Sequence, residues 1–203
     1  MISHLHESIF IHVPKCAGTS MGKFLRTKNF SNISYHQAKD GSHDNETGAY
    51  KIGTSRRLKR GLEDIWQDYF KFGFVRNPWD RSVSCWKNRG GPYKEFKDFI
   101  KAYPYEKNGD AKRSTQNIIW HALPQYVHLC DENGDLIVDF IGRFENIESD
   151  LYEVCRVLDI NYEELGRHNA TERKPYQEYY DQETIDRVAE IYKKDIEMFN
   201  YDY

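Results

Sequence analysis

The sequence predicts an α/β fold in three layers, with a mainly parallel central sheet flanked by helices. Short apolar, β-rich runs alternate with apolar stripes at helical spacing, and polar turns separate the two kinds of segment. The chain has 203 residues, which suffices for one domain that buries roughly 70% of its unfolded surface. We therefore expect a single domain over residues 1–203.

Strands are expected at residues 8–13, 69–75 and 137–141. Each is a short apolar run of the kind that forms a buried strand. Pro14 closes the first run, because proline has no N–H to donate to a neighbouring strand. A turn rich in Asp, Asn and Gly at residues 131–135 precedes the third run. The three runs would form the interior of the sheet.

Helices are expected after Thr19, near Asp80, after Asn146 and after Asp181. Asp80 and Asn146 suit the N-cap position, since their side chains accept hydrogen bonds from the first turn of a helix. The two later helices have one-sided apolar stripes, a pattern that faces a core. These stripes are Ile147, Leu151, Val154 and Leu158 in one helix, and Ile185, Val188, Ala189, Tyr192, Ile196 and Phe199 in the other.

The segment from Pro14 to Ser20 links the first strand to the first helix. A strand–loop–helix turn points several backbone N–H groups at one place, which suits an anion. Gly18 lets the backbone approach a ligand, Thr19 and Ser20 add hydroxyl donors, and Lys15 adds a positive charge. The lysine precedes the glycine, so this is not a Walker A loop. The alternative is a plain strand-to-helix turn with Lys15 in solvent.

A second polar segment runs from Arg76 to Ser84, directly after the strand at residues 69–75. Arg76 stands at the carboxyl end of that strand, where ligands of open α/β sheets bind. Ser84 follows in the next helix, and the turn would bring an arginine fork and a hydroxyl onto one phosphate. Alternatively, Arg76 pairs with Asp80 across the turn. Two phosphate sites on one sheet fit a ligand phosphorylated at both its 5′ and 3′ ends.

Together the two segments resemble those of the sulfotransferases that use 3′-phosphoadenosine 5′-phosphosulfate (PAPS). Pro14-Lys15-Cys16-Ala17-Gly18-Thr19-Ser20 is similar to the 5′-phosphosulfate loop of that family, and Arg76 to Ser84 is similar to its 3′-phosphate motif. The resemblance continues through residues 139–146 and around residues 179–181. The chain most resembles the carbohydrate O-sulfotransferase group with heparan 2-O- and chondroitin-type enzymes, in a compact bacterial form.

The resemblance implies a P-loop-like sulfotransferase fold, PAPS as co-substrate and no metal. It places one set of residues on the 5′ side of the donor, with Arg76 and Ser84 on the 3′-phosphate; the set is Lys15, Cys16, Ala17, Gly18, Thr19 and Ser20. Lys15 would also act catalytically, because negative charge grows on the departing phosphate. Arg173 and Lys174 stand where relatives carry a basic loop over the donor, and the alternative for both is a solvated loop.

In-line transfer of a sulfuryl group to a hydroxyl needs a general base. Relatives offer a histidine before the strand at residues 69–75, where this chain has Lys51. We expect His43 to be the catalytic base, with His36, Lys51 and Glu145 as alternatives. The resemblance implies that the acceptor is a carbohydrate, either a glycan or a glycoconjugate.

Composition bears on partners and location. No apolar run reaches the roughly 18 residues of a membrane span, and we expect neither a membrane segment nor a nucleic-acid partner. The four cysteines, Cys16, Cys85, Cys130 and Cys155, lack the spacing of a disulfide framework or a metal site, which indicates reduced thiols in a cytoplasmic protein. The sequence does not indicate an oligomeric state.

Charge is segregated along the chain. Residues 51–118 hold 16 Lys and Arg against 8 Asp and Glu, whereas residues 121–170 hold 3 against 11. Runs of charge are usually solvated surface, but the basic part contains Arg76. A cleft that attracts a polyanionic donor or an acidic glycan is therefore expected.

The sequence leaves two alternatives to an active sulfotransferase. A non-catalytic module that binds PAPS, another nucleotide or a glycan would fit the presence of Lys51 in place of the histidine. A P-loop small-molecule kinase is disfavoured, because the Gly-Lys-Ser/Thr order and an acidic Mg²⁺ site are missing.

Overall fold

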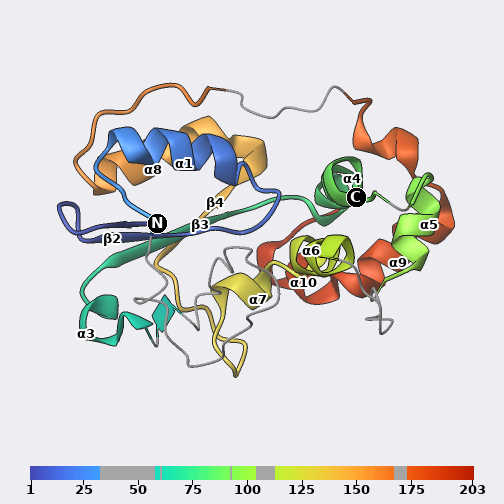
Figure 1. Cartoon of the computed structure of the whole chain (residues 1–203), viewed down its shortest axis with the longest axis horizontal. Helices are drawn as coiled ribbons and strands as arrows, with labels where there is room; N and C mark the ends of the chain where they lie inside the picture. Colours follow the sequence, from blue (N-terminus) through green and yellow to red (C-terminus); the bar gives the residue numbers. More distant parts are fainter. Residues whose placement is uncertain (33–57, 60, 92, 104–112, 167–172) are drawn as a thin grey trace. The chain divides into compact units, whose positions relative to one another are not determined.

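The structure is a computed structural model, and it describes residues 1–32, 58–59, 61–91, 93–103, 113–166 and 173–203. The chain divides into two compact units (Figure 1). The first unit comprises Met1–Val75 and Tyr126–Asn169, and the second comprises Arg76–Gln125 and Ala170–Tyr203. The expectation of one domain over residues 1–203 stays a prediction.

A mainly parallel sheet forms the centre of the first unit, as the sequence predicts. Its order among the described residues is β1-β2-β3-β4. Strand β1 pairs antiparallel with β2, whereas β2, β3 and β4 run parallel to one another. The strands are β1 (Ile2–Ser3), β2 (Ser8–Ile11), β3 (Phe70–Val75) and β4 (Phe140–Arg143).

The third expected strand begins three residues late, at Phe140 rather than at residue 137. The cause lies in the turn that precedes it. Ile137 donates its backbone N–H to the carbonyl of Leu129, and Leu136 forms a bridge with Cys130. Residues 136 and 137 therefore close the turn instead of extending the sheet.

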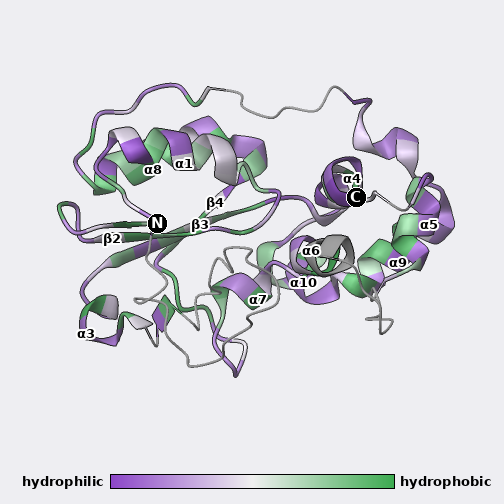
Figure 2. Ribbon diagram, in the orientation of Figure 1, coloured by the Kyte–Doolittle hydropathy of each residue, from purple (hydrophilic) through white to green (hydrophobic). Residues whose placement is uncertain are grey.

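Helices cover both faces of this sheet (Figure 1). Helices α1 (Gly18–Thr27) and α8 (Ile147–Val157) lie on one face, and the short helices α3 (Glu63–Trp66) and α7 (Tyr126–Leu129) lie on the other. The 3₁₀ turn η1 (Phe144–Asn146) joins β4 to α8. Hydrophobic residues lie along β2 and β3 (Figure 2), and every residue of the two strands except Phe70 is buried. The first unit is thus the three-layer α/β structure that the sequence predicts.

The described part of the second unit is helical. It contains α4 (Pro78–Arg89), α5 (Phe96–Lys101), α6 (Arg113–Ala122), the 3₁₀ turn η2 (Tyr176–Tyr179), α9 (Gln182–Ile191) and α10 (Lys193–Phe199). Helix α4 packs against α5, α6, α9 and η2. The apolar core includes Trp79, Val83, Phe99, Ile118 and Val188. Helix α4 is therefore the central element of this unit.

The N-cap prediction for α4 was wrong. Asn77, not Asp80, caps the helix, and its side-chain oxygen accepts hydrogen bonds from the N–H groups of Trp79 and Asp80. Pro78 occupies the first helical position, where its missing N–H costs nothing. Asp80 is consequently free of the capping role and lies inside the first turn. At the other expected cap, the side chain of Asn146 makes no cap bond. Asp181, which the sequence placed just before a helix, forms a capping box with Thr184.

All four cysteines are buried free thiols. In the part of the chain that the structure describes, no helix is long and apolar enough to cross a membrane.

Candidate functional site

The loop after β2 has an unusual backbone. Lys15 and Ala17 both adopt positive φ angles, of 69° and 59°. A left-handed conformation costs a residue with a side chain about 1–2 kcal/mol, and such strain is concentrated at functional sites. Ala17 is also the N-cap of α1, yet its methyl group cannot accept a hydrogen bond. The loop therefore presents the first turn of α1 with no side-chain cap from that position.

The side chains of this loop divide between interior and surface. Cys16 and Ser20 are buried, Lys15 is half-buried and Thr19 is exposed. The Cys16 thiol lies 3.6 Å from the carbonyl oxygen of Pro14, within the loop itself. Cys16 thus packs the loop from inside, whereas Lys15 and Thr19 reach its accessible side.

Gly18 has a close neighbour that sequence analysis did not predict. A Cβ atom at Gly18 would lie only 2.3 Å from Nε2 of His12, so the imidazole is seated directly against the glycine. His12 follows β2 and its ring also stacks near Phe10, with centroids 6.2 Å apart. Strand β2 ends at Ile11, two residues before the expected end at residue 13, so His12 stands after the strand and not inside it as predicted. Sequence spacing did not reveal its contact across the loop.

In the second unit, Asp80 joins two arginines. Its Oδ2 accepts hydrogen bonds from Nε and Nη2 of Arg76, at 2.7 and 2.6 Å, and its Oδ1 accepts one from Nη2 of Arg173. The Arg76 side chain is only 7% exposed. The pairing of Arg76 with Asp80 was one of the two sequence-based alternatives. Asp80 is thus shared by two guanidinium groups.

The remaining predicted residues of this unit lie near the same helix or at the surface. Nη1 of Arg173 is buried and has no hydrogen-bond partner among the residues that the structure describes. Ser84 is half-buried on α4, one turn beyond Asp80 on the same helical face. Lys174 is exposed and pairs with Glu178. The structure therefore brings Arg76 and Arg173 together through Asp80, and it leaves Lys174 on the surface.

Tyr180 packs beside this group but is a poor candidate for acid–base chemistry. Burial raises the pKa of its phenol well above the ordinary value, and the nearby charge of Asp80 adds to the shift. Its hydroxyl donates a hydrogen bond to the carbonyl of Trp79 at 2.8 Å. The phenol stays protonated at neutral pH and holds the start of α4 in place.

Most candidates for the general base cannot be located. His43, His36 and Lys51 lie outside the described residues. Glu145 is described, and it is exposed in the 3₁₀ turn that follows β4. The assignment of His43 as the base stays a prediction.

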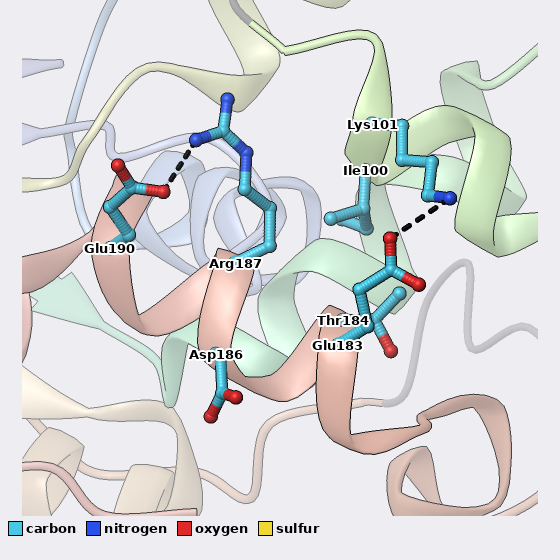
Figure 3. Close-up of a pocket in the computed structure, with 7 residues that line it drawn as sticks. All are labelled: Ile100, Lys101, Glu183, Thr184, Asp186, Arg187 and Glu190. Atoms are coloured by element: carbon cyan, nitrogen blue, oxygen red, sulfur yellow. Dashed lines mark hydrogen bonds and ion pairs between the residues drawn. The ribbon is translucent and has the colours of Figure 1, made fainter.

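We looked for a metal-binding group and for a cavity among the residues that the structure describes. The described residues hold no group of three or more His, Cys, Asp or Glu side chains that could bind a metal ion. An open cavity of about 570 Å³ is lined by residues of α5 and α9 (Figure 3). Two ion pairs lie in its lining, Lys101 with Glu183 and Arg187 with Glu190. None of the predicted site residues lines this cavity.

Comparison with known proteins assigns the family. A model of the sulfotransferase family matches residues 1–202, nearly the whole chain. The chain belongs to the sulfotransferase family. The match includes both the loop at Lys15 and the arginine at the start of the second unit, so the family resemblance predicted from these segments is confirmed.

Relatives within the sulfotransferase family include carbohydrate sulfotransferases. The chain is 22% identical to carbohydrate sulfotransferase 11 of Rattus norvegicus, over 97% of this chain and 65% of that protein. It is 25% identical to carbohydrate sulfotransferase 10 of Mus musculus, over 82% of this chain and 48% of that protein. The chain thus spans about half to two thirds of the length of these relatives. No solved structure was found to match it.

Proposed function

We propose that this chain transfers the sulfuryl group of PAPS to a hydroxyl group of a carbohydrate. Membership of the sulfotransferase family supports the reaction, and the names of the relatives support a carbohydrate acceptor. The observation that carries the choice of donor is the arginine pair on Asp80, with its buried, unpartnered Nη1 of Arg173. A 3′-phosphate would supply an acceptor for this Nη1, and PAPS differs from common nucleotides in having one.

The donor would use both polar segments. Arg76, Arg173 and Ser84 would bind the 3′-phosphate, because guanidinium groups form strong, directed hydrogen bonds to phosphate oxygens. The loop from Lys15 to Ser20 would bind the 5′-phosphosulfate through backbone N–H groups and hydroxyls. The left-handed residues Lys15 and Ala17 support this assignment, since such turns form concave sets of N–H groups that hold anions.

In the reaction, the acceptor oxygen attacks sulfur while the bond from sulfur to the bridging phosphate oxygen breaks. The acceptor proton passes to a base, and the electron pair of the broken bond stays on the 5′-phosphate of the product, 3′-phosphoadenosine 5′-phosphate (PAP). Lys15 would stabilise this growing charge more than it stabilises the bound donor, which is the condition for catalysis. His43 is the proposed base. A reaction without metal and a cytoplasmic location stay predictions.

Calorimetric titration with PAP tests the proposal. Wild-type protein should bind PAP, should bind ATP much more weakly and should transfer sulfate from PAPS to a carbohydrate in an acceptor screen. Arg76→Ala should lose PAP binding. Arg156→Ala is the matched control, since Arg156 is an exposed arginine of α8 that pairs with neighbouring Glu153. Absence of PAP binding would remove the donor assignment, and binding without transfer to any acceptor would indicate a non-catalytic module.

A further inference from the structure

The backbone of Arg76 is held by a side chain. Strand pairing ends at Val75, which pairs with Arg143 of β4. At the next residue, the N–H of Arg76 donates to Oε1 of Gln125 at 2.8 Å, and Nε2 of Gln125 donates to the carbonyl oxygen of Arg76 at 2.8 Å. Gln125 lies 49 positions further along the chain. Its amide thus forms with Arg76 the two bonds that a neighbouring strand would form.

Gln125 is itself fixed from the C-terminal part of the second unit. Its side chain is fully buried, and its backbone N–H donates to Oδ2 of Asp195 at 2.7 Å. Asp195, on α10, is also fully buried. Hydrogen bonds in such a dry interior are strong, and a donor or acceptor left without its partner there is costly. Asp195, Gln125 and Arg76 therefore form a rigid chain of contacts.

This chain of contacts controls one end of the Arg76 side chain, and Asp80 controls the other. The amide of Gln125 fixes the backbone from which the side chain departs, whereas the carboxylate of Asp80 binds Nε and Nη2 at its tip. A guanidinium group forms paired bonds to phosphate only when its plane is correctly placed. A small displacement of the backbone would tilt that plane.

We propose that Gln125 is a positioning residue that sets the preference of this protein for a 3′-phosphorylated nucleotide. The inference rests on the proposed function, because it takes Arg76 to be a ligand of the 3′-phosphate. Gln125 does not touch the phosphate in this account. Gln125 acts through the backbone of Arg76, and the carboxylate of Asp195 fixes Gln125 by accepting its backbone N–H.

The test measures a selectivity rather than an affinity alone. Binding of PAP and of adenosine 5′-phosphate, which lacks the 3′-phosphate, is measured for wild type, Gln125→Met and Gln125→Asn. Methionine keeps the volume but loses both bonds to Arg76. Asparagine keeps an uncharged amide but is one methylene group shorter, so it cannot keep both bonds to Arg76. We expect both variants to bind PAP about tenfold more weakly, with little change for adenosine 5′-phosphate.

Tyr192→Phe is the matched control. The Tyr192 hydroxyl donates to the carbonyl of Ala122 at 2.8 Å, so its loss removes one buried hydrogen bond of the same unit without touching Arg76. This variant should melt at a lower temperature and keep the wild-type ratio of the two affinities. If the ratio of the affinities for PAP and adenosine 5′-phosphate does not change in the folded Gln125 variants, Gln125 has no positioning role.

The design separates this inference from the proposed function. A wild-type protein that does not prefer PAP over adenosine 5′-phosphate contradicts the proposed function. A wild-type protein that does prefer PAP, together with a Gln125→Asn variant of unchanged preference, contradicts only the role of Gln125. Should Gln125→Met fail to fold, Gln125→Asn still decides the question, because it keeps an uncharged amide in the interior and alters only its reach to Arg76.

Discussion

Arg173 donates a hydrogen bond from Nη2 to Oδ1 of Asp80, although the two residues lie 93 positions apart in the chain. The other oxygen of the carboxylate binds Arg76, so Asp80 holds two arginines that would otherwise repel each other. A bound phosphate could take over this role. Asp80 is therefore both the support of the pair and a competitor of the ligand.

Asp80→Asn should make the protein less stable but more strongly stabilised by PAP. Removing the carboxylate breaks a nearly buried ion pair with Arg76, and we expect a loss of about 2 kcal/mol in the free energy of unfolding. A 3′-phosphate would replace the lost charge, so saturating PAP should raise the melting temperature of Asp80→Asn by more than that of wild type. Thermal unfolding with and without PAP measures both effects.

Adenosine 5′-phosphate is the control for this prediction, because it carries no 3′-phosphate and should not restore the stability of Asp80→Asn. If PAP raises the melting temperatures of wild type and Asp80→Asn equally, the phosphate does not bind between the two arginines.

Lys15→Ala should lower kcat by about 10²–10³-fold, since it removes a positive charge from the place where the departing phosphate gains negative charge. The affinity for PAP should fall much less, by under about tenfold, because the loop N–H groups remain. Steady-state transfer from PAPS and direct titration with PAP give the two quantities. Lys23→Ala removes the same charge from an exposed position of α1 and should leave kcat unchanged. An unchanged kcat in Lys15→Ala, with only weaker binding, would contradict a catalytic role.

Gly18→Ala and Gly22→Ala should have opposite effects, although both lie in α1. A Cβ at Gly18 would lie 2.3 Å from His12 Nε2, whereas a Cβ at Gly22 would meet nothing nearer than 3.6 Å. We expect Gly18→Ala to lower the free energy of unfolding by about 1–3 kcal/mol. Gly22→Ala should raise it by about 1 kcal/mol, because alanine favours a helix over glycine.

A double variant shows whether the contact with His12 is the cause. His12→Ala removes the ring that opposes the new methyl group, so Gly18→Ala should cost much less in that background. Chemical denaturation of the two single variants and the double variant gives the coupling. If the losses in the free energy of unfolding are additive in the double variant, the loop backbone and not the imidazole opposes the substitution.

The sequence predicted the sheet of the first unit and the loop that follows β2 because both depend on local patterns. Buried strands leave short apolar runs, and a strand-to-helix turn with Pro14 and Gly18 is visible in the sequence itself. The cap of α4 was also within reach. Pro at the first helical position is a known signal, and it indicates Asn77 as the N-cap one residue earlier.

The features that the sequence did not predict depend mainly on contacts between residues far apart in the chain. Gln125 reaches Arg76 across 49 positions and Arg173 reaches Asp80 across 93, and neither pair has a spacing that a helix or strand would show. The positive φ angle of Ala17 was equally hidden, because alanine carries no signal for a left-handed backbone as glycine does. Sequence patterns thus predict the segments of the candidate site but not the contacts that fix their geometry.

Asp181 makes the stability of the second unit fall at acidic pH. Its carboxylate accepts a hydrogen bond from Lys97 Nζ at 2.8 Å and caps α9 through the N–H of Thr184 at 2.9 Å. The hydrogen bond from Lys97 is the main reason that its pKa is held below the ordinary 3.8, followed by those from Thr184. A carboxyl group whose pKa is lower in the folded state stabilises that state above the unfolded pKa and loses this contribution as the pH falls through and below it.

Wild type should therefore lose part of its stability between about pH 5 and pH 2, and Asp181→Asn should lose less. Asparagine can still cap the helix, so this variant removes the titrating charge and its pairing with Lys97 while it keeps the cap. Melting temperatures across this pH range should converge at the acidic end, with wild type the more stable at neutral pH. If the melting temperatures of wild type and Asp181→Asn fall in parallel with pH, groups other than Asp181 cause the acid sensitivity. The difference should be small and should shrink in high salt, because the Asp181 side chain is 52% exposed and exposed pairs are screened.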